Sequence, residues 1–165
     1  MIFKIKNHSL DLYNTLLSLS RNLYFYNKIN LKDTFETRIY LMFVHFSIIL
    51  IIFKKNKNNF PQKSYDDLFY SIENNLRELS LGDIAVNKKM KNLNKIFYDI
   101  LLKINQSSNN LKINKNLIIK YFPQLDDSDS KKYELFNQYF INFYDFCFEL
   151  HPETMIKDAL KFKEK

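Results

Sequence analysis

Apolar residues recur at steps of three and four along most of the chain, which is the spacing of one face of an α-helix. One such stripe spans residues 64–79, and a second spans residues 87–104. The stripes consist of Tyr65, Leu68, Phe69, Ile72, Leu76 and Leu79, and then Met90, Leu93, Phe97, Ile100, Leu101 and Ile104. The pattern predicts two helices that are joined by a tight polar corner.

The residues around this corner predict how each helix begins and ends. Ser64 is a candidate N-cap for the first helix, with Asp67 completing a capping-box-like start. Gly82, the only glycine in the chain, follows the first stripe, so we expect a left-handed residue there after the helix end. Asn87 is a candidate N-cap for the second helix.

Three lysines follow this second cap. Lys88, Lys89 and Lys91 would occupy the first turn, where the helix dipole disfavours cations by roughly 0.3–1 kcal/mol each. Folding stability does not explain them there, whereas an acidic or phosphate-bearing partner would. General lysine richness is the alternative explanation for the cluster.

Arg77 lies at the flank of the first helix and has two candidate partners. A chain reversal at Gly82 would bring it to Asp83, and Glu73 lies one turn earlier on the same helix. We therefore predict a structural clamp at Arg77, with a partner-binding role as the alternative.

The most apolar run covers residues 39–53, between Arg38 and Lys54. It is shorter than the ~17–25 residues that a membrane-spanning helix needs, and it contains His45 and Ser47. An all-round apolar helix of this length is typical of the buried centre of a bundle. We expect His45 to be buried and hydrogen-bonded.

The remaining pattern predicts further helices and no strands. Helical spacing covers residues 9–20, 111–122, a long segment from about residue 130 to 150, and a short one from Pro152 to Leu160. Asp33 or Thr34 can cap the central helix. One glycine and three prolines leave little turn chemistry for β-hairpins. The expected fold is an all-α, single-domain helical bundle over residues 1–165 around the buried helix at 39–53.

Composition changes this picture little. The formal net charge of +7 would favour nucleic acid, anionic lipid or acidic protein as partner, but the abundance of Lys and Asn is typical of AT-rich coding sequence. Cys147, the only cysteine, falls on an apolar face and suits a reducing compartment. Since no secretory signal or transit peptide is visible, we expect a cytoplasmic bacterial protein, with contact at the inner face of the membrane as a further option.

No arrangement of residues predicts catalysis. His8, His45 and His151 lack ligand spacing, and a single glycine excludes a glycine-rich phosphate loop. The carboxylates near the corner are expected to form salt bridges and caps. We therefore predict no catalytic, metal or cofactor-binding residues.

Around the corner the chain resembles a known family. The run Asn75-Leu76-Arg77-Glu78, then Gly82-Asp83, Val86, Lys88-Lys89-Met90-Lys91 and Phe97-Tyr98, resembles the signature of the ubiquinol–cytochrome c chaperone family. This family includes mitochondrial assembly factors for cytochrome b and their α-proteobacterial relatives, and the latter are the closer likeness. The similarity covers roughly residues 20–100. Ser80 and Asp99 depart from it, since members usually have glycine at the first position and a glycine–arginine pair follows the aromatic residues.

The resemblance implies an all-α, non-enzymatic protein without a cofactor. It would bind newly made cytochrome b during assembly of the cytochrome bc1 complex, and mitochondrial members act near the ribosomal exit tunnel with a small partner protein. The partner-binding residues carried over from the motif are Asn75, Arg77, Glu78, Gly82, Asp83, Lys88, Lys89, Lys91, Phe97 and Tyr98. The competing hypothesis is a basic ribosome-, RNA- or membrane-surface-binding module without a client of its own, and DNA is not an expected partner.

Overall fold

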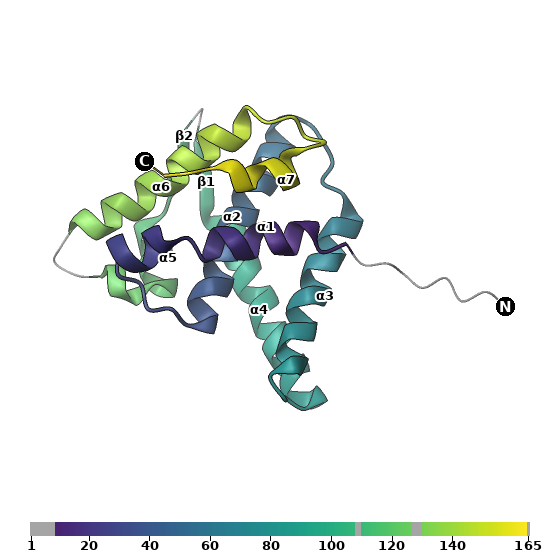
Figure 1. The fold of residues 1–165 in the computed structure, drawn as a ribbon. Helices are drawn as coiled ribbons and strands as arrows, with labels where there is room; N and C mark the ends of the chain where they lie inside the picture. Colours follow the sequence, from purple (N-terminus) through teal and green to yellow (C-terminus); the bar gives the residue numbers. More distant parts are fainter. Residues whose placement is uncertain (1–8, 108–109, 127–129, 165) are drawn as a thin grey trace.

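Helix α2 (Phe35–Lys55) lies at the centre of the computed structural model, which describes residues 9–107, 110–126 and 130–164 (Figure 1). Helices α1 (Asp11–Ser20), α4 (Asp83–Lys103) and α6 (Ser130–Phe148) all pack against it. Every residue from Leu41 to Ile49 is buried. The predicted central helix is confirmed; its start at Phe35 agrees with the predicted cap, and it ends at Lys55, two residues beyond the predicted apolar run.

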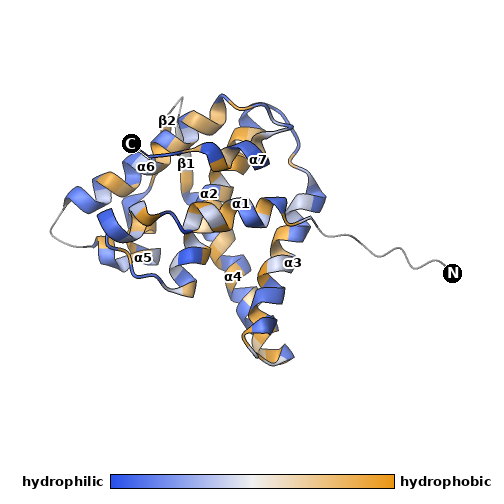
Figure 2. Ribbon diagram, viewed as in Figure 1, coloured by the Kyte–Doolittle hydropathy of each residue, from blue (hydrophilic) through white to orange (hydrophobic). Residues whose placement is uncertain are grey.

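The other elements connect and cover these helices. They are a π-helical turn (Tyr24–Lys28), α3 (Gln62–Glu78), β1 (Ile104–Ser107), β2 (Asn110–Ile113), α5 (Lys115–Tyr121), a 3-10 turn (Pro123–Leu125), α7 (Met155–Asp158) and a second 3-10 turn (Ala159–Lys161). The predicted all-α class is confirmed. Figure 2 shows that apolar residues concentrate on α2 and on the helix faces that cover it, whereas polar residues lie outside.

A short β-hairpin is the main departure from the predicted elements. Strands β1 and β2 pair antiparallel, with Ile104 opposite Ile113. The helix expected over residues 111–122 therefore begins only at Lys115. Buried Leu111 and Ile113 flank exposed Lys112, which is the two-residue period of a strand.

Several predicted helix starts are also wrong. Helix α3 begins at Gln62 after Pro61, so Ser64 lies inside the helix and does not cap it. Asp67 is buried instead of capping, and it accepts hydrogen bonds from the Ser9 backbone N–H (2.9 Å) and the Lys63 Nζ (2.7 Å). These bonds tie the chain before α1 to α3, a long-range role that local spacing does not indicate.

The predicted cap of α2 is confirmed, and the predicted start of the last helix is wrong. Thr34 caps α2, because its Oγ1 accepts from the Thr37 backbone N–H at 3.1 Å. Arg38 then pairs with Asp33 through two donors, at 2.6 and 2.8 Å. Near the other end, Pro152 lies in a turn, and α7 begins at Met155.

By length and composition alone, α2 is the one helix of the described residues that could cross a membrane. However, 72% of its most apolar window is buried inside the fold. Its apolar surface is therefore covered by protein in this structure, as expected for the core helix of a bundle.

His45 confirms the expectation of a buried, hydrogen-bonded histidine. Its Nδ1 donates to the Leu41 carbonyl at 2.7 Å, and its Nε2 accepts from the Tyr139 hydroxyl at 3.0 Å on α6. The rings of Phe140 and Phe143 pack edge-on against it at centroid distances of 4.9 and 4.8 Å. Because burial disfavours the charged imidazolium, the pKa of His45 is lowered to about 3.

The buried imidazole makes folding stability depend on pH. Since the folded-state pKa lies below the unfolded value of about 6.5, the stability is fully present above pH 6.5 and is lost as pH falls towards 3. We expect the free energy of unfolding to fall by about 1.4 kcal/mol for each pH unit below 6.5 from this group. Urea unfolding of the wild type and of His45→Gln at pH 7, 6 and 5 measures it.

The variant should start less stable at pH 7 because it disturbs the buried contacts. Its stability should nevertheless fall less steeply than that of the wild type between pH 6.5 and 5. Parallel pH profiles for the two proteins would contradict the assignment of this dependence to His45.

Candidate partner-binding surface

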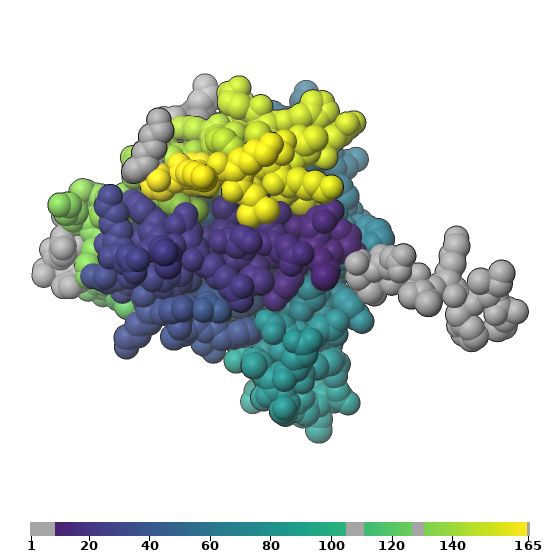
Figure 3. Space-filling model, viewed as in Figure 1, coloured from purple at the N-terminus to yellow at the C-terminus, as the bar shows by residue number. Residues whose placement is uncertain are grey.

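Helices α3 and α4 form a hairpin whose far end projects from the body of the molecule (Figures 1 and 3). Leu76 on α3 and Val86 on α4 are buried near this end. Nearer the body, Phe97 is fully buried, and its ring packs against those of Phe43 and Phe46 at centroid distances of 5.3 and 5.4 Å. Phe97 is thus a core residue with no exposed surface, and its role in binding a partner stays a prediction.

The turn at the far end differs from the predicted one. Ser80 is the left-handed residue, with φ of 63°, and Gly82 has φ of −66° and ψ of 161° as the N-cap of α4. A Cβ added at Gly82 would meet nothing within 4 Å. Helix α4 therefore begins at Asp83, one turn before Asn87, because the residues after Gly82 continue in helical conformation and bury Val86.

Arg77 holds the corner together, and both partners expected for it are present. One guanidinium nitrogen donates to Asp83 across the turn, and the other donates to Glu73 Oε1 at 3.1 Å. The hydrogen bonds to Asp83 and to Glu73 raise the pKa of Arg77. The three side chains form the predicted structural clamp, although it is exposed to solvent.

Of the other motif residues on α3, Asn75 contacts the body of the molecule and Glu78 faces the solvent. Asn75 donates from its Nδ2 to the Tyr13 hydroxyl at 3.3 Å and so connects α3 to α1. Glu78 is exposed at the end of α3. Asn75 is therefore a packing residue, whereas Glu78 remains accessible to a partner.

The early start of α4 overturns the dipole argument for the lysines. Lys88, Lys89 and Lys91 lie beyond the first turn, where the dipole effect has fallen off. Lys89 is half-buried, with its Nζ 3.5 Å from Glu36 Oε1 and 5.2 Å from the centroid of the Phe35 ring. Lys89 therefore stabilises the contact between α4 and the start of α2.

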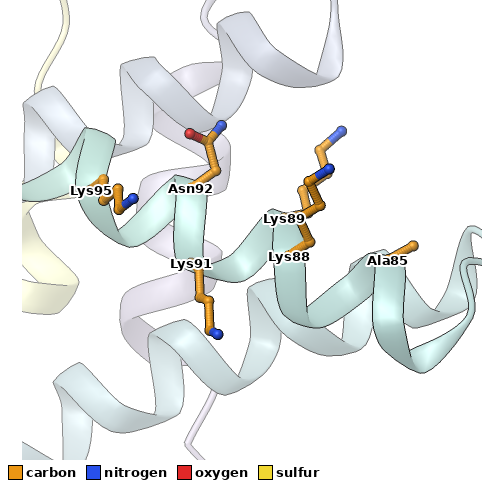
Figure 4. A pocket seen from close by; sticks show the side chains of 6 residues that line it. All are labelled: Ala85, Lys88, Lys89, Lys91, Asn92 and Lys95. Carbon is orange, nitrogen blue, oxygen red and sulfur yellow. The ribbon is translucent and has the colours of Figure 1, made fainter.

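Lys88, Lys91 and Lys95 form a cationic face along the outside of α4. All three are exposed, and none has a salt bridge within residues 9–107, 110–126 and 130–164. They line a shallow depression of about 560 Å³ together with Ala85, Lys89 and Asn92 (Figure 4). Lys91 leaves α4 on the opposite side from Lys89.

Lys95 was missed in the sequence, although steps of three and four from Lys88 place it on the same face. Tyr98 continues this side of α4. It is 52% exposed, and its hydroxyl lies 3.5 Å from that of Tyr65. Tyr98 is accessible to a partner, unlike its neighbour Phe97.

Asp99 follows Phe97 and Tyr98, where the family usually has glycine and arginine, so this chain has an acid in place of a positive charge. Its carboxylate accepts from Lys103 Nζ at 2.6 Å, from Lys120 Nζ at 2.9 Å, and from the Tyr121 hydroxyl. Hydrogen bonds from Lys103, Tyr121 and Lys120 hold the pKa of Asp99 well below its usual range. The aspartate connects α4 to α5, which explains why an acid is accommodated here.

Three aliphatic side chains at the far end of the hairpin form an aliphatic tip. Leu79, Leu81 and Ile84 are 58%, 37% and 87% exposed. Leu79 belonged to the predicted buried stripe, and that assignment is wrong. In the sequence, these three aliphatic residues interrupt an otherwise polar corner, and that interruption is the signal of the tip.

A family model described as ubiquinol-cytochrome C chaperone matches residues 27–115, just over half of the chain. The chain belongs to this family. Searches among curated proteins and among solved structures found no match.

The segment shared with the ubiquinol-cytochrome C chaperone family contains α2, α3 and α4 and all ten motif residues. It therefore includes the corner clamp, the cationic face and the aliphatic tip. Assignment to the α-proteobacterial branch of the family stays a prediction.

Outside this surface, the Cys147 thiol and the possible metal ligands in the described part of the chain show no arrangement that would bind or react. Cys147 is buried as predicted, and burial raises the pKa of its thiol to about 12. Among the described residues, no three His, Cys, Asp or Glu side chains lie close enough together to hold a metal ion.

The turn geometry predicts opposite outcomes for the two small residues. Ser80→Gly should raise the free energy of unfolding by about 1 kcal/mol, because glycine adopts the left-handed conformation without steric cost. Gly82→Ser should leave stability unchanged or raise it, since serine is a favoured N-cap. Thermal unfolding of both variants measures these changes. A large loss in Gly82→Ser would show that the glycine is required for the turn.

Thermal unfolding should also distinguish Lys89 from Lys88 and Lys91. Lys89→Ala should lower the free energy of unfolding by about 0.5–1 kcal/mol through loss of the contact with the Phe35 ring. Lys88→Ala and Lys91→Ala should leave the melting temperature unchanged, because both side chains are exposed. An equal loss in all three variants would contradict a purely surface position for Lys88 and Lys91.

Proposed function

We propose that this protein is a non-enzymatic assembly chaperone that binds newly synthesised cytochrome b during assembly of the cytochrome bc1 complex. The observation that carries the proposal is the match to the ubiquinol-cytochrome C chaperone family over residues 27–115. The protein would act on the cytoplasmic side of the membrane into which cytochrome b is inserted. A ribosome near its exit tunnel and a small partner protein are the further partners that this role suggests.

The outward side of α4 is the surface that we assign to the client. Ile84, Lys88, Lys91, Lys95 and Leu102 lie on this side at steps of three, four and seven, and all are exposed. With a rise of 1.5 Å per residue, the row extends about 27 Å along the helix.

This composition suits a client that is largely apolar. Lysine side chains can lay their alkyl stems along apolar surface while the ammonium groups stay in water. Leu102, at the body end of the row, is 80% exposed and adds apolar area. A contact of this kind covers a membrane protein segment without holding it in a deep pocket, so release remains possible.

Deletion of the gene should lower the amounts of assembled bc1 complex and of haem-loaded cytochrome b. Native gels and reduced-minus-oxidised spectra of isolated membranes measure the two quantities. Normal levels of both in the deletion strain would overturn the proposal.

Complementation of the deletion strain distinguishes an effect of the cationic face from an effect of the protein's net charge. Lys88→Glu/Lys91→Glu/Lys95→Glu should fail to restore assembly, because it reverses the cationic face. The matched control Lys32→Glu/Lys54→Glu/Lys157→Glu changes the net charge equally at exposed positions elsewhere and should restore it. A photocrosslinker at Tyr98 should capture cytochrome b, whereas one at Lys157 should not.

A further inference from the structure

We propose that the end of the α3–α4 hairpin is a membrane-docking element that inserts the aliphatic tip into the interface of an anionic bilayer. Leu79, Leu81 and Ile84 would contact the acyl boundary, and Lys88 and Lys91 would contact lipid phosphates. Since Ile84, Lys88 and Lys91 also belong to the side of α4 assigned to the client, they would meet the lipid and the client in turn and not together. Docking of the purified protein to vesicles needs no client, so it is independent of whether cytochrome b is the client.

The side chains of the aliphatic tip lie outside the hydrophobic core. Its three side chains are 58%, 37% and 87% exposed, and they gather at the point of the hairpin that lies farthest from the body (Figures 1 and 3). The turn itself is held by the Arg77 clamp and by the Ser80 N–H bond to the Arg77 carbonyl. Isolated exposed apolar residues are ordinary on protein surfaces, but a cluster at a projecting end indicates contact with an apolar phase.

The lysines lie at the depth that lipid headgroups would occupy. Along α4, Lys88 is about 6 Å and Lys91 about 10 Å farther from the tip than Ile84. Peripheral elements bury their apolar side chains about 5–10 Å into the boundary between headgroups and acyl chains. When Ile84 reaches that boundary, both ammonium groups therefore stand at the level of the phosphates.

Two lysines next to the tip are the groups that favour an anionic surface. Arg77, with one positive charge, pairs with both Glu73 and Asp83, and Glu78 is the third acid of the hairpin end, so the attraction depends on Lys88 and Lys91. Lys88 and Lys91 have no salt bridge to any residue that the structure describes. Each lysine close to an anionic membrane adds to binding, and its flexible stem lets the charge stay in the headgroup layer.

A bilayer explains the combination of features better than RNA or a folded protein does. Single-stranded RNA is bound through aromatic stacking and cationic grooves, in which exposed leucine and isoleucine have no function. A protein partner would need a pocket shaped to a convex tip, whereas a fluid bilayer accepts such a tip without one. The lipid surface therefore accounts for both the aliphatic and the cationic side chains.

Because the chain contains no tryptophan, a single introduced tryptophan reports on insertion without background. Ile84→Trp should show a blue-shifted emission with vesicles of phosphatidylcholine and phosphatidylglycerol, and brominated acyl chains should quench it. Leu102→Trp, at the other end of the same side of α4, should show neither change. Quenching at both positions would mean that α4 lies flat on the membrane. Quenching at neither would mean that the tip does not insert. Either result overturns the proposal.

Vesicle sedimentation tests the two chemical contributions. Lys88→Gln/Lys91→Gln should weaken binding to the anionic vesicles roughly 30-fold, given the usual contribution of two lysines at an anionic surface. Leu81→Asn/Ile84→Asn should weaken binding at least about tenfold, since apolar area contributes to interfacial affinity. The controls Lys32→Gln/Lys157→Gln and Leu23→Asn/Leu160→Asn change exposed residues elsewhere and should bind as the wild type does.

Circular dichroism melting checks that every variant is folded at the assay temperature. Equal binding to pure phosphatidylcholine vesicles would overturn the requirement for anionic lipid. Full binding by the Leu81→Asn/Ile84→Asn variant would reduce the interaction to non-specific charge attraction and overturn the role of the tip.

Discussion

The need to cover α2 on every side determines the arrangement of the other helices. The helix is apolar around its whole circumference, so water must be excluded from all of it, and α1, α4 and α6 pack against it for that reason. The His45–Tyr139 hydrogen bond adds a directional contact to this apolar packing. A shift of α6 by one turn would leave both polar groups buried without partners, which is costly. The bond therefore specifies how α6 sits on α2.

Much of this architecture could be predicted because it depends on local patterns. The buried centre at residues 39–53, the Thr34 cap and the Arg77 clamp follow from hydrophobic spacing and from partners a few residues away. The errors have two causes, contacts between distant parts of the chain and the local geometry of a turn. Asp67 was read as a local cap because its bond to Ser9 crosses from α3 to the segment before α1. The left-handed residue was assigned to Gly82 because glycine is the usual choice, whereas Ser80 adopts that conformation.

The candidate surface was predicted only in part, because a sequence motif does not separate packing residues from accessible ones. Phe97 packs in the core, Asn75 bonds to α1, and Lys89 contacts the start of α2. Lys88, Lys91 and Tyr98 are exposed, and Lys95 joins them although the motif omits it. Most of the corner motif thus preserves the shape of the hairpin. The accessible remainder is small enough to be tested residue by residue.

The position of the central helix early in the chain has a consequence for biosynthesis. Helix α6 follows α2 only after α3, α4, the β-hairpin and α5. At about 5–20 residues per second, the ribosome needs several seconds to make this intervening chain. During that interval the side of α2 that α6 will cover, including His45, has no native partner. While it is being translated, the polypeptide is therefore itself an apolar segment in need of shielding.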